Sequence, residues 1–279
     1  MELLMGGRLR QAGFTLVELV ITIVLLAILA IATSDFIRSG ALIFSQGADR
    51  QALLGEARFA IQRINQELRN ALPNSASVTQ GGACLSFVPI ASSGTFVDLP
   101  SFPASGNQVT LVPTLDQSAL AGVYPIASYI LSAAEILNGN ALINANCSTQ
   151  TLKQHCVNIP TVAAGATTYT ASLVDNAGAA QAVSFAATSP SQRYYLLNQP
   201  VAFCIKDNEL HRFSPPPTNL SQENGGLLAR HLSTAAGDNG FTTVPPSLSR
   251  NGLINLRFRF VDGQEYLDFN YDITVPNQP

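Results

Sequence analysis

The chain has 279 residues and a formal net charge of −3, and only 12% of its residues are charged. So low a charged fraction, together with abundant alanine, serine, threonine and asparagine, favours an exported protein. The slight negative charge, and the lack of any cluster of lysine and arginine interleaved with aromatic residues, argue against general nucleic-acid binding.

A run of twenty residues from Phe14 to Thr33 is largely apolar, and its only charge is Glu18. As a helix rising about 1.5 Å per residue, this run would span about 30 Å, the thickness of the hydrocarbon core of a bilayer. Arg8 and Arg10 precede it, so the positive-inside rule predicts a cytoplasmic N-terminus and a single crossing. A carboxylate in such a span is costly without a partner, which makes Glu18 a candidate functional residue.

The six residues from Gly13 to Glu18 read Gly-Phe-Thr-Leu-Val-Glu. With the short basic leader and the apolar run, they resemble the processing site of type IV prepilins and pseudopilins. In that family a membrane-embedded peptidase cuts after the glycine and methylates the new N-terminal residue, here Phe14. The resemblance implies that Glu18, the fifth residue of the mature chain, pairs with the N-terminal amine of a neighbouring subunit during filament assembly. The alternative is a single-span signal anchor whose glutamate lies at the level of the lipid headgroups.

The resemblance also implies a division of the chain. It predicts a cleaved cytoplasmic leader at 1–13, a transmembrane and filament-core helix at 14–34, an amphipathic helix at 35–72 and a periplasmic or extracellular β-rich domain at 73–279. The implied partners are the prepilin peptidase, other major and minor pilins and an inner-membrane assembly platform. The protein would lie first in the bacterial inner membrane, held there by residues 14–33, and later in a pilus at the cell surface.

The helix is predicted to continue beyond the membrane as far as Leu72, because Pro73 cannot continue it. From residue 53 onward, apolar side chains recur at helical spacing within an arc of about 120°, which predicts a helix half-buried against a globular domain. Arg63 and Glu67 are one helical step apart and are expected to pair. The apolar arc is formed by Leu53, Leu54, Ala57, Ala60, Ile61, Ile64, Leu68 and Leu72.

Between the span and this apolar arc, large apolar residues point to nearly opposite sides of the helix. No polar face shields them outside the membrane, so they need partners on all sides, as in a filament core of packed N-terminal helices. Phe59 lies on the polar arc, where it is either a single exposed aromatic residue or a contact with a neighbouring subunit. The apolar residues are Phe36, Ile37, Leu42, Ile43 and Phe44.

From residue 74 onward, prolines and glycines separate short β-rich runs, which predict strands. Two long segments, 161–192 and 214–252, have a composition too generic to place in the fold. The predicted strands lie within 84–90, 108–112, 168–174 and 193–198.

Two hairpins are predicted around short turns. A two-residue turn at Asp207-Asn208 would join strands at 201–206 and 209–213 and set Lys206 opposite Glu209.

The second turn, Asp262-Gly263, would join strands at 253–261 and 264–275 and set Arg257 opposite Asp268. Charged residues alternate with apolar ones along both strands, so the charged face is either a binding patch or a solvated sheet face. The apolar face is expected to cover the amphipathic helix, which predicts an α+β fold with a long N-terminal α-helix packed on an antiparallel β-sheet. This is also the fold that the resemblance to type IV pilins implies.

Four cysteines in a domain expected to face the oxidising periplasm predict two disulfides. Three pairings are possible, and the sequence alone does not choose among them. The favoured pairing closes a short polar loop with one bond and joins two strand-like segments with the other. The first bond is Cys147–Cys156 and the second is Cys84–Cys204. A zinc site that recruits His155 and His211 is the alternative, but the sequence has no Cys-x-x-Cys or His-x-x-x-His spacing.

Catalytic motifs are missing from the sequence. The three histidines, His155, His211 and His231, have no neighbours that would complete a metalloprotease or catalytic-triad motif. The sequence also contains no phosphate-binding loop and no EF-hand calcium loop. We therefore expect no enzymatic activity, no cofactor and no bound metal.

Shorter segments resemble the minor pilins of the mannose-sensitive haemagglutinin (MSHA) pilus, which are in turn similar to J-type minor pseudopilins of type II secretion. These segments are 63–75, 200–205 with 210–213, and 275–279. The resemblance implies a subunit that helps prime or cap a surface filament used for attachment. Two alternatives stay open: a J-type pseudopilin of a secretion machine and, from another class, a standalone membrane-anchored periplasmic binding protein.

Overall fold

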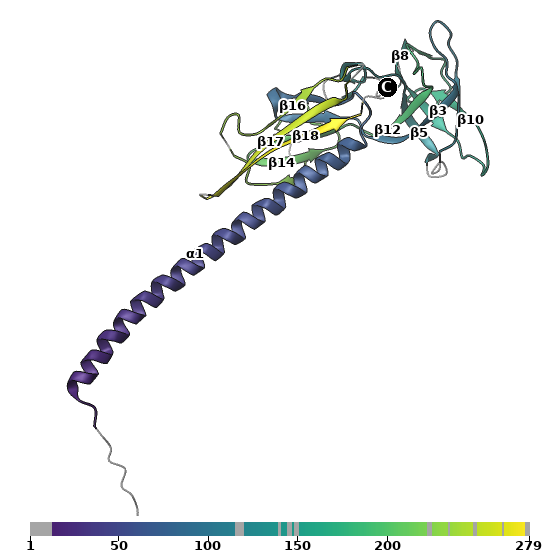
Figure 1. The fold of residues 1–279 in the computed structure, drawn as a ribbon. Helices are drawn as coiled ribbons and strands as arrows, with labels where there is room; N and C mark the ends of the chain where they lie inside the picture. Colours follow the sequence, from purple (N-terminus) through teal and green to yellow (C-terminus); the bar gives the residue numbers. More distant parts are fainter. Residues whose placement is uncertain are drawn as a thin grey trace, which may run out of the picture. The chain divides into compact units, whose positions relative to one another are not determined.

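The computed structural model describes residues 13–114, 120–138, 141–143, 147, 151–221, 225–233, 235–247, 250–263 and 265–276. The chain forms two compact units, one ending at Gln51 and the other beginning at Ala52. A single helix, α1 (Leu16–Arg69, 54 residues), contributes to both units (Figure 1). In the first unit, every described residue of α1 is exposed, so that part of the helix makes no core within the chain.

α1 ends at Arg69, three residues before the predicted end at Leu72. The residue before a proline is disfavoured in the helical region, so Pro73 already acts on Leu72. The Leu72 N–H instead donates to the Val88 carbonyl at 2.7 Å, and Ala71 forms an isolated bridge with Pro89. Strand-type hydrogen bonds thus replace the last helical turn.

The first sheet has five antiparallel strands in the order β1-β2-β13-β14-β15. The turn between β13 and β14 is the predicted one. Asp207 and Asn208 adopt φ values of 50° and 65°, the left-handed conformation that a type I′ turn requires. Lys206 pairs with Glu209, as predicted. The strands are β1 (Ser77–Thr79), β2 (Cys84–Phe87), β13 (Val201–Lys206), β14 (Glu209–Phe213) and β15 (Gly226–Ala229).

Between β2 and β13, which are neighbours in this sheet, the chain forms a closed barrel in the order β10-β4-β3-β12-β5-β9. Buried aliphatic and aromatic residues fill it, among them Leu111, Ile126, Leu173 and Tyr194. The sequence did not predict that these strands close into a barrel. The predicted strand at 84–90 divides between β2 and the first residue of β3. The strands are β3 (Ile90–Asp98), β4 (Gln108–Leu111), β5 (Gly122–Ala127), β9 (Gln154–Ile159), β10 (Tyr169–Val174) and β12 (Arg193–Leu197).

Short elements complete the segment inserted between β2 and β13, and one further short element, η1, precedes β2. The predicted strand at 168–174 forms β10, and the rest of the segment at 161–192, which the sequence left unplaced, supplies the two-residue strand β11, which pairs in parallel with β8. The short elements are η1 (Gln80–Gly82), η3 (Ala133–Glu135), β6 (Leu137–Asn138), β7 (Ala141–Leu142), β8 (Thr151–Leu152) and β11 (Ser184–Phe185).

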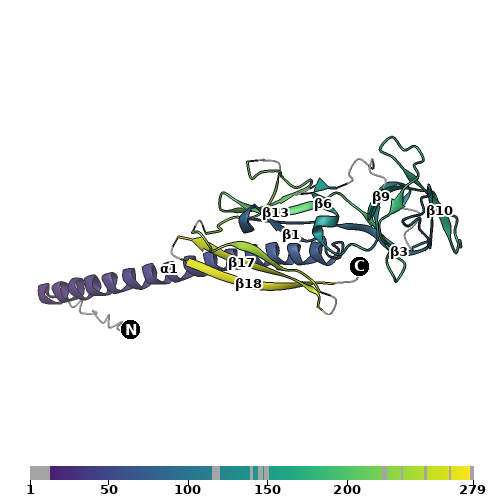
Figure 2. The same cartoon turned by 90° about the horizontal axis from the view of Figure 1, so that it is seen from above.

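The third sheet contains β16 (Gly240–Val244), β17 (Gly252–Asp262) and β18 (Glu265–Val275), in that order. Figure 2 shows β17 and β18 side by side. The predicted register of this hairpin is wrong, because Asp262 pairs with Glu265 and the turn therefore begins one residue later.

As a consequence, Asp268 lies opposite Arg259 rather than the predicted Arg257, which pairs with Asn270. The shift moves each pairing by two residues. Side chains in a strand alternate with a period of two, so every residue keeps its predicted face.

The predicted apolar arc of α1 packs against both the first and the third sheets. Ile64 and Leu68 are fully buried in one cluster with Phe203 of β13 and with Phe258 and Phe260 of β17. Leu54, by contrast, is only half-buried. At about 25 cal/mol per Å² of apolar area, burial of such side chains is the main term that holds this half of the helix to the sheets. The fold is α+β, as predicted.

Candidate processing and assembly site

The predicted processing site lies immediately before the first turn of α1. Gly13 is exposed, and a Cβ atom placed on it would meet no other group within 4 Å. Phe14 is 71% exposed. The described residues of the chain therefore do not shield the Gly13–Phe14 peptide bond from a protease.

Thr15 caps the helix. The Glu18 backbone N–H donates to Thr15 Oγ1 at 3.3 Å, and the Leu19 N–H donates to the Thr15 carbonyl at 3.2 Å. This role of Thr15 was not predicted, although Thr-x-x-Glu is the sequence pattern of a capping box and signals it. The cap fixes the helix start so that Phe14 stays outside the helix and Glu18 lies in its first turn.

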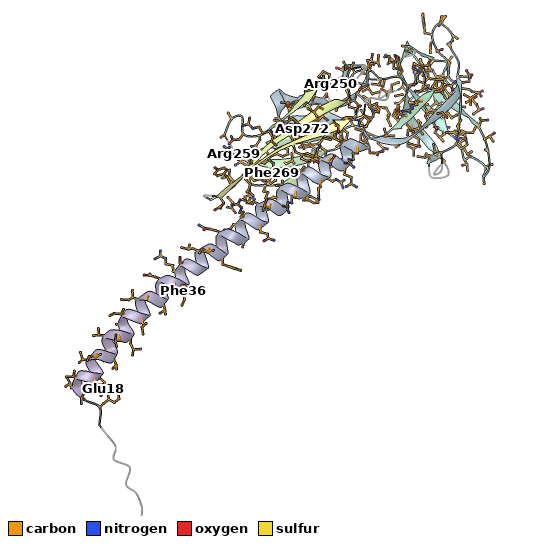
Figure 3. The ribbon with its side chains drawn as sticks, in the orientation of Figure 1. Glu18, Phe36, Arg250, Arg259, Phe269 and Asp272 are labelled. Carbon is orange, nitrogen blue, oxygen red and sulfur yellow. A yellow bond between two sulfur atoms is a disulfide. The ribbon has the colours of Figure 1, made fainter. Side chains whose placement is uncertain are left out.

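Glu18 occupies the first turn of α1, where the helix dipole favours a negative charge (Figure 3). Among the described residues, none donates a hydrogen bond to its carboxylate and none forms an ion pair with it. Inside a membrane this position demands a partner, and a partner from another molecule would have open access to it.

The other polar groups of the span are satisfied within the helix. Thr22 Oγ1 donates to the Leu19 carbonyl at 2.8 Å, and Thr33 Oγ1 donates to the Leu29 carbonyl at 2.7 Å. Hydroxyl groups bonded in this way are tolerated in lipid. Within the described part of the chain, α1 is the one helix long and apolar enough to cross a membrane. The hydroxyl groups of Thr22 and Thr33 thus have partners within the helix, whereas the carboxylate of Glu18 has none among the described residues.

The apolar residues that follow the span are exposed, as the sequence predicted. Phe36 is 79% exposed, Ile43 is 69% exposed and Phe44 is 80% exposed. Nothing in the first unit covers them. This stretch of α1 therefore presents apolar surface on all sides, beyond the length that a bilayer needs.

Comparison with known proteins agrees with this geometry. Residues 8–34 match a family model described as the prokaryotic N-terminal methylation motif. The match covers the part of the leader that contains Arg8 and Arg10, the processing site and the apolar run. It indicates a type IV pilin-like or pseudopilin-like protein that is anchored in a membrane and processed by a prepilin peptidase. Searches of curated proteins and of solved structures found no match to the chain.

The four cysteines form the two favoured disulfides, Cys84–Cys204 and Cys147–Cys156. Cys84 and Cys204 are direct partners in the pairing of β2 with β13, so the first bond fastens the base of the barrel insertion. The histidines proposed for the zinc alternative are neighbours of bonded cysteines, with His211 opposite Cys204 in the pairing of β13 with β14 and His155 next to Cys156 in β9, but their ring nitrogens have other partners. His155 Nε2 contacts the carbonyls of Leu152 and Ser184, and His211 Nε2 lies 3.0 Å from Glu209.

The predicted pair of Arg63 and Glu67 forms, with Arg63 Nε donating to Glu67 Oε1 at 2.6 Å. Glu67 also accepts from Arg212 Nε of β14 at 2.8 Å, a contact that the sequence could not reveal. Phe59 is 55% exposed. Phe59 and Leu227 both line a surface hollow of about 340 Å³, so Phe59 is either a single exposed aromatic residue or a contact with another subunit.

The charged face of the β17–β18 hairpin is organised around Arg259. Its Nε and Nη2 atoms donate to the two carboxylate oxygens of Asp268 at 2.6 and 3.0 Å, and its Nη1 donates to Asp238 at 3.1 Å. The hydrogen bond from Arg259 holds the pKa of Asp268 below its usual range. The contact of Arg259 with Asp238 ties the segment before β16 to the hairpin. Residues that were predicted to form a charged face thus have a structural role.

Proposed function

We propose that this protein is a minor subunit of a type IV pilus of the MSHA class, and that it acts in filament assembly and surface attachment rather than as an enzyme. The N-terminal methylation motif at residues 8–34 supports the pilin assignment. The MSHA assignment rests on the shorter resemblances at 63–75, 200–205 and 210–213.

The observation that carries the proposal is the exposed apolar stretch of α1 beyond the membrane span. Among the described residues, Phe36 and Phe44 are two of the most exposed large apolar side chains, at 79% and 80%. Exposed apolar patches of this kind mark interaction surfaces. Packing against the N-terminal helices of other subunits would bury them, whereas a standalone periplasmic anchor would leave them in water.

Glu18 and Phe14 then have complementary roles. Cleavage after Gly13 creates an amine at Phe14, and that amine exists only in the processed chain. In the lipid, where ε is low, the pairing of this amine with Glu18 of another subunit removes two unpaired charges at once. Assembly is thereby favoured over the isolated subunit, and only after processing. The chain itself has no nucleotide-binding loop, so a separate cytoplasmic ATPase would supply the energy.

The first test is the mature N-terminus. N-terminal sequencing and mass spectrometry of protein purified from membranes should find N-methyl-Phe14. Gly13→Ser should abolish cleavage and leave the full-length chain in the membrane. Recovery of mature wild-type protein that still begins at Met1 would refute the pilin assignment.

The second test is the role of Glu18. Glu18→Gln should still be cleaved, but its amount in sheared filaments should fall about tenfold, the equivalent of about 1.4 kcal/mol of lost pairing. Asp35→Asn is the matched control, because it removes a carboxylate from the same helix outside the first turn. Equal amounts of the Glu18→Gln and wild-type proteins in filaments would contradict the intersubunit pair. If deletion of the gene instead blocked the secretion of hydrolases and left pili intact, the J-type pseudopilin alternative would be correct.

A further inference from the structure

Strand β18 is a long free edge. It pairs with β17 over its whole length, from Glu265 to Val275, without a bulge. It is the terminal strand of its sheet, and within the described residues no strand pairs with its other side. Sheet edges are usually blunted by proline, lysine, a bulge or a covering segment, because an open edge is a template for another strand. β18 contains neither proline nor lysine nor arginine.

The register identifies the backbone groups that face outward. In a hairpin with a two-residue loop, the residues that flank the loop form a hydrogen-bonded pair, and such pairs alternate along the ladder. Because Asp262 pairs with Glu265, residues 266, 268, 270, 272 and 274 direct their N–H and C=O groups away from β17. An added strand would bond to these groups.

The inner face of β18 offers apolar surface to such a strand. Phe269 contacts Phe260 edge-on, with ring centroids 5.8 Å apart, yet it is only half-buried, as is Leu267. Tyr271 on the same face is 43% exposed. These three side chains extend the hydrophobic core to the edge of the sheet and leave it uncovered there.

The outer face of β18 carries two carboxylates, Asp268 and Asp272, of which Figure 3 labels Asp272. Asp268 is already paired with Arg259. Asp272 accepts a hydrogen bond from Asn255 Nδ2 at 2.7 Å, and no cation pairs with it among the described residues. A strand placed beside Asp272 is therefore stabilised by a basic side chain and destabilised by an acidic one.

We propose that β18 is a docking edge for a β-strand of another protein in which apolar residues alternate with lysine or arginine. Its apolar side chains would cover Phe269 and Tyr271, its basic side chains would face Asp272, and its backbone would bond to the outward groups of β18. Pairing of β18 with β18 of a second copy is disfavoured, because it would bring the acidic faces of two identical strands together. The site does not depend on N-terminal processing.

The test uses the full-length protein in detergent and two short, capped, fluorescent peptides. In one peptide valine alternates with lysine, and in the other valine alternates with glutamate. The lysine peptide should bind with at least a tenfold lower Kd, roughly the effect of one favourable charge contact. It should also slow amide hydrogen exchange at residues 266, 268, 270, 272 and 274. Equal binding of the two peptides, or protection elsewhere without protection of β18, would overturn the proposal.

Variants at two positions locate the contact. Asn270→Pro removes an outward N–H but no backbone hydrogen bond to β17, so it should keep the sheet and abolish peptide binding. Asn270→Ala is the matched control, because it also loses the side-chain bond from Asn255 Nδ2 of β17 but keeps the outward N–H, and it should bind normally. Asp272→Lys should weaken the lysine peptide about tenfold and leave the fold intact even if the proline variant unfolds. Undiminished binding by Asp272→Lys, or dimerisation of the wild-type protein through β18, would refute the proposed partner chemistry.

Discussion

Removal of the Cys84–Cys204 disulfide is expected to destabilise the second unit more than removal of Cys147–Cys156. The perturbation consists of two double variants, Cys84→Ala with Cys204→Ala and Cys147→Ala with Cys156→Ala. All four cysteines are at most 5% exposed, so both variants lose a similar amount of packing. The two bonds differ chiefly in the length of chain that they enclose, with sequence separations of 120 and 9 residues.

The expected difference follows from these separations. In the chain-entropy model, a disulfide restricts the unfolded chain by an amount that grows with the logarithm of the enclosed length. The separation of 120 residues gives about 4.9 kcal/mol at 25 °C, and the separation of 9 residues gives about 2.6 kcal/mol. The double variant of Cys84 and Cys204 should therefore be less stable than the other by about 2.3 kcal/mol.

Urea unfolding of the full-length protein in detergent measures this difference. The chain has no tryptophan, so circular dichroism of the β-sheet signal is the appropriate probe. The wild-type protein and both double variants should unfold with similar slopes and different midpoints. If the short-loop variant is destabilised as much as the long-loop variant, or more, the reasoning from loop length is refuted.

Three further predictions concern α1 and the β17–β18 hairpin. Thr15→Val should weaken the first turn of α1 by about 1 kcal/mol, seen as faster amide exchange there, whereas Thr15→Ser should behave as wild type. Ile64→Ala should lower the free energy of unfolding, measured with urea, by about 2–5 kcal/mol, because the Ile64 side chain is fully buried. Gln62 is exposed, so Gln62→Ala should have little effect. Equal effects of the two substitutions would contradict the observed packing. Arg259 lowers the pKa of Asp268, so the ionised carboxylate of Asp268 should stabilise the fold above the pKa that this group has in the unfolded chain. This stabilisation should be lost as pH falls through the lower pKa of the folded state. NMR titration of the Asp268 carboxyl should show the lowered pKa, and an ordinary pKa would contradict the prediction.

Local patterns predicted the elements that depend on neighbouring residues. The apolar arc from Leu53 to Leu68 has the period of a helix, and that period predicted which side of the helix is buried, although Leu54 is only half-buried. Asp207 and Asn208 are residues that tolerate the left-handed conformation, so the turn and its register could be placed. The capping role of Thr15 was equally accessible from the Thr-x-x-Glu pattern.

The register of the last hairpin could not be read in the same way. A shift of two residues keeps every side chain of β17 and β18 on its face, so alternation fits both registers equally well. In the structure, Arg259 lies between Asp268 and Asp238, and Asp238 reaches it from before β16. In the observed register, Arg259 thus pairs both with Asp268 of the hairpin and with Asp238, which lies outside the hairpin.

The sequence by itself determined the N-terminal part of this protein. The processing motif, the span and the exposed apolar stretch depend on local helix formation and on the order of residues along the chain, so no internal contact was needed to predict them. Only the tertiary structure decided that β2 and β13 pair across an inserted barrel, that Glu67 joins Arg212 and that β18 ends its sheet as an open edge. Each of these features depends on residues far apart in the chain. Closure of the barrel and burial of apolar side chains, rather than a local sequence pattern, determine which of these residues pair.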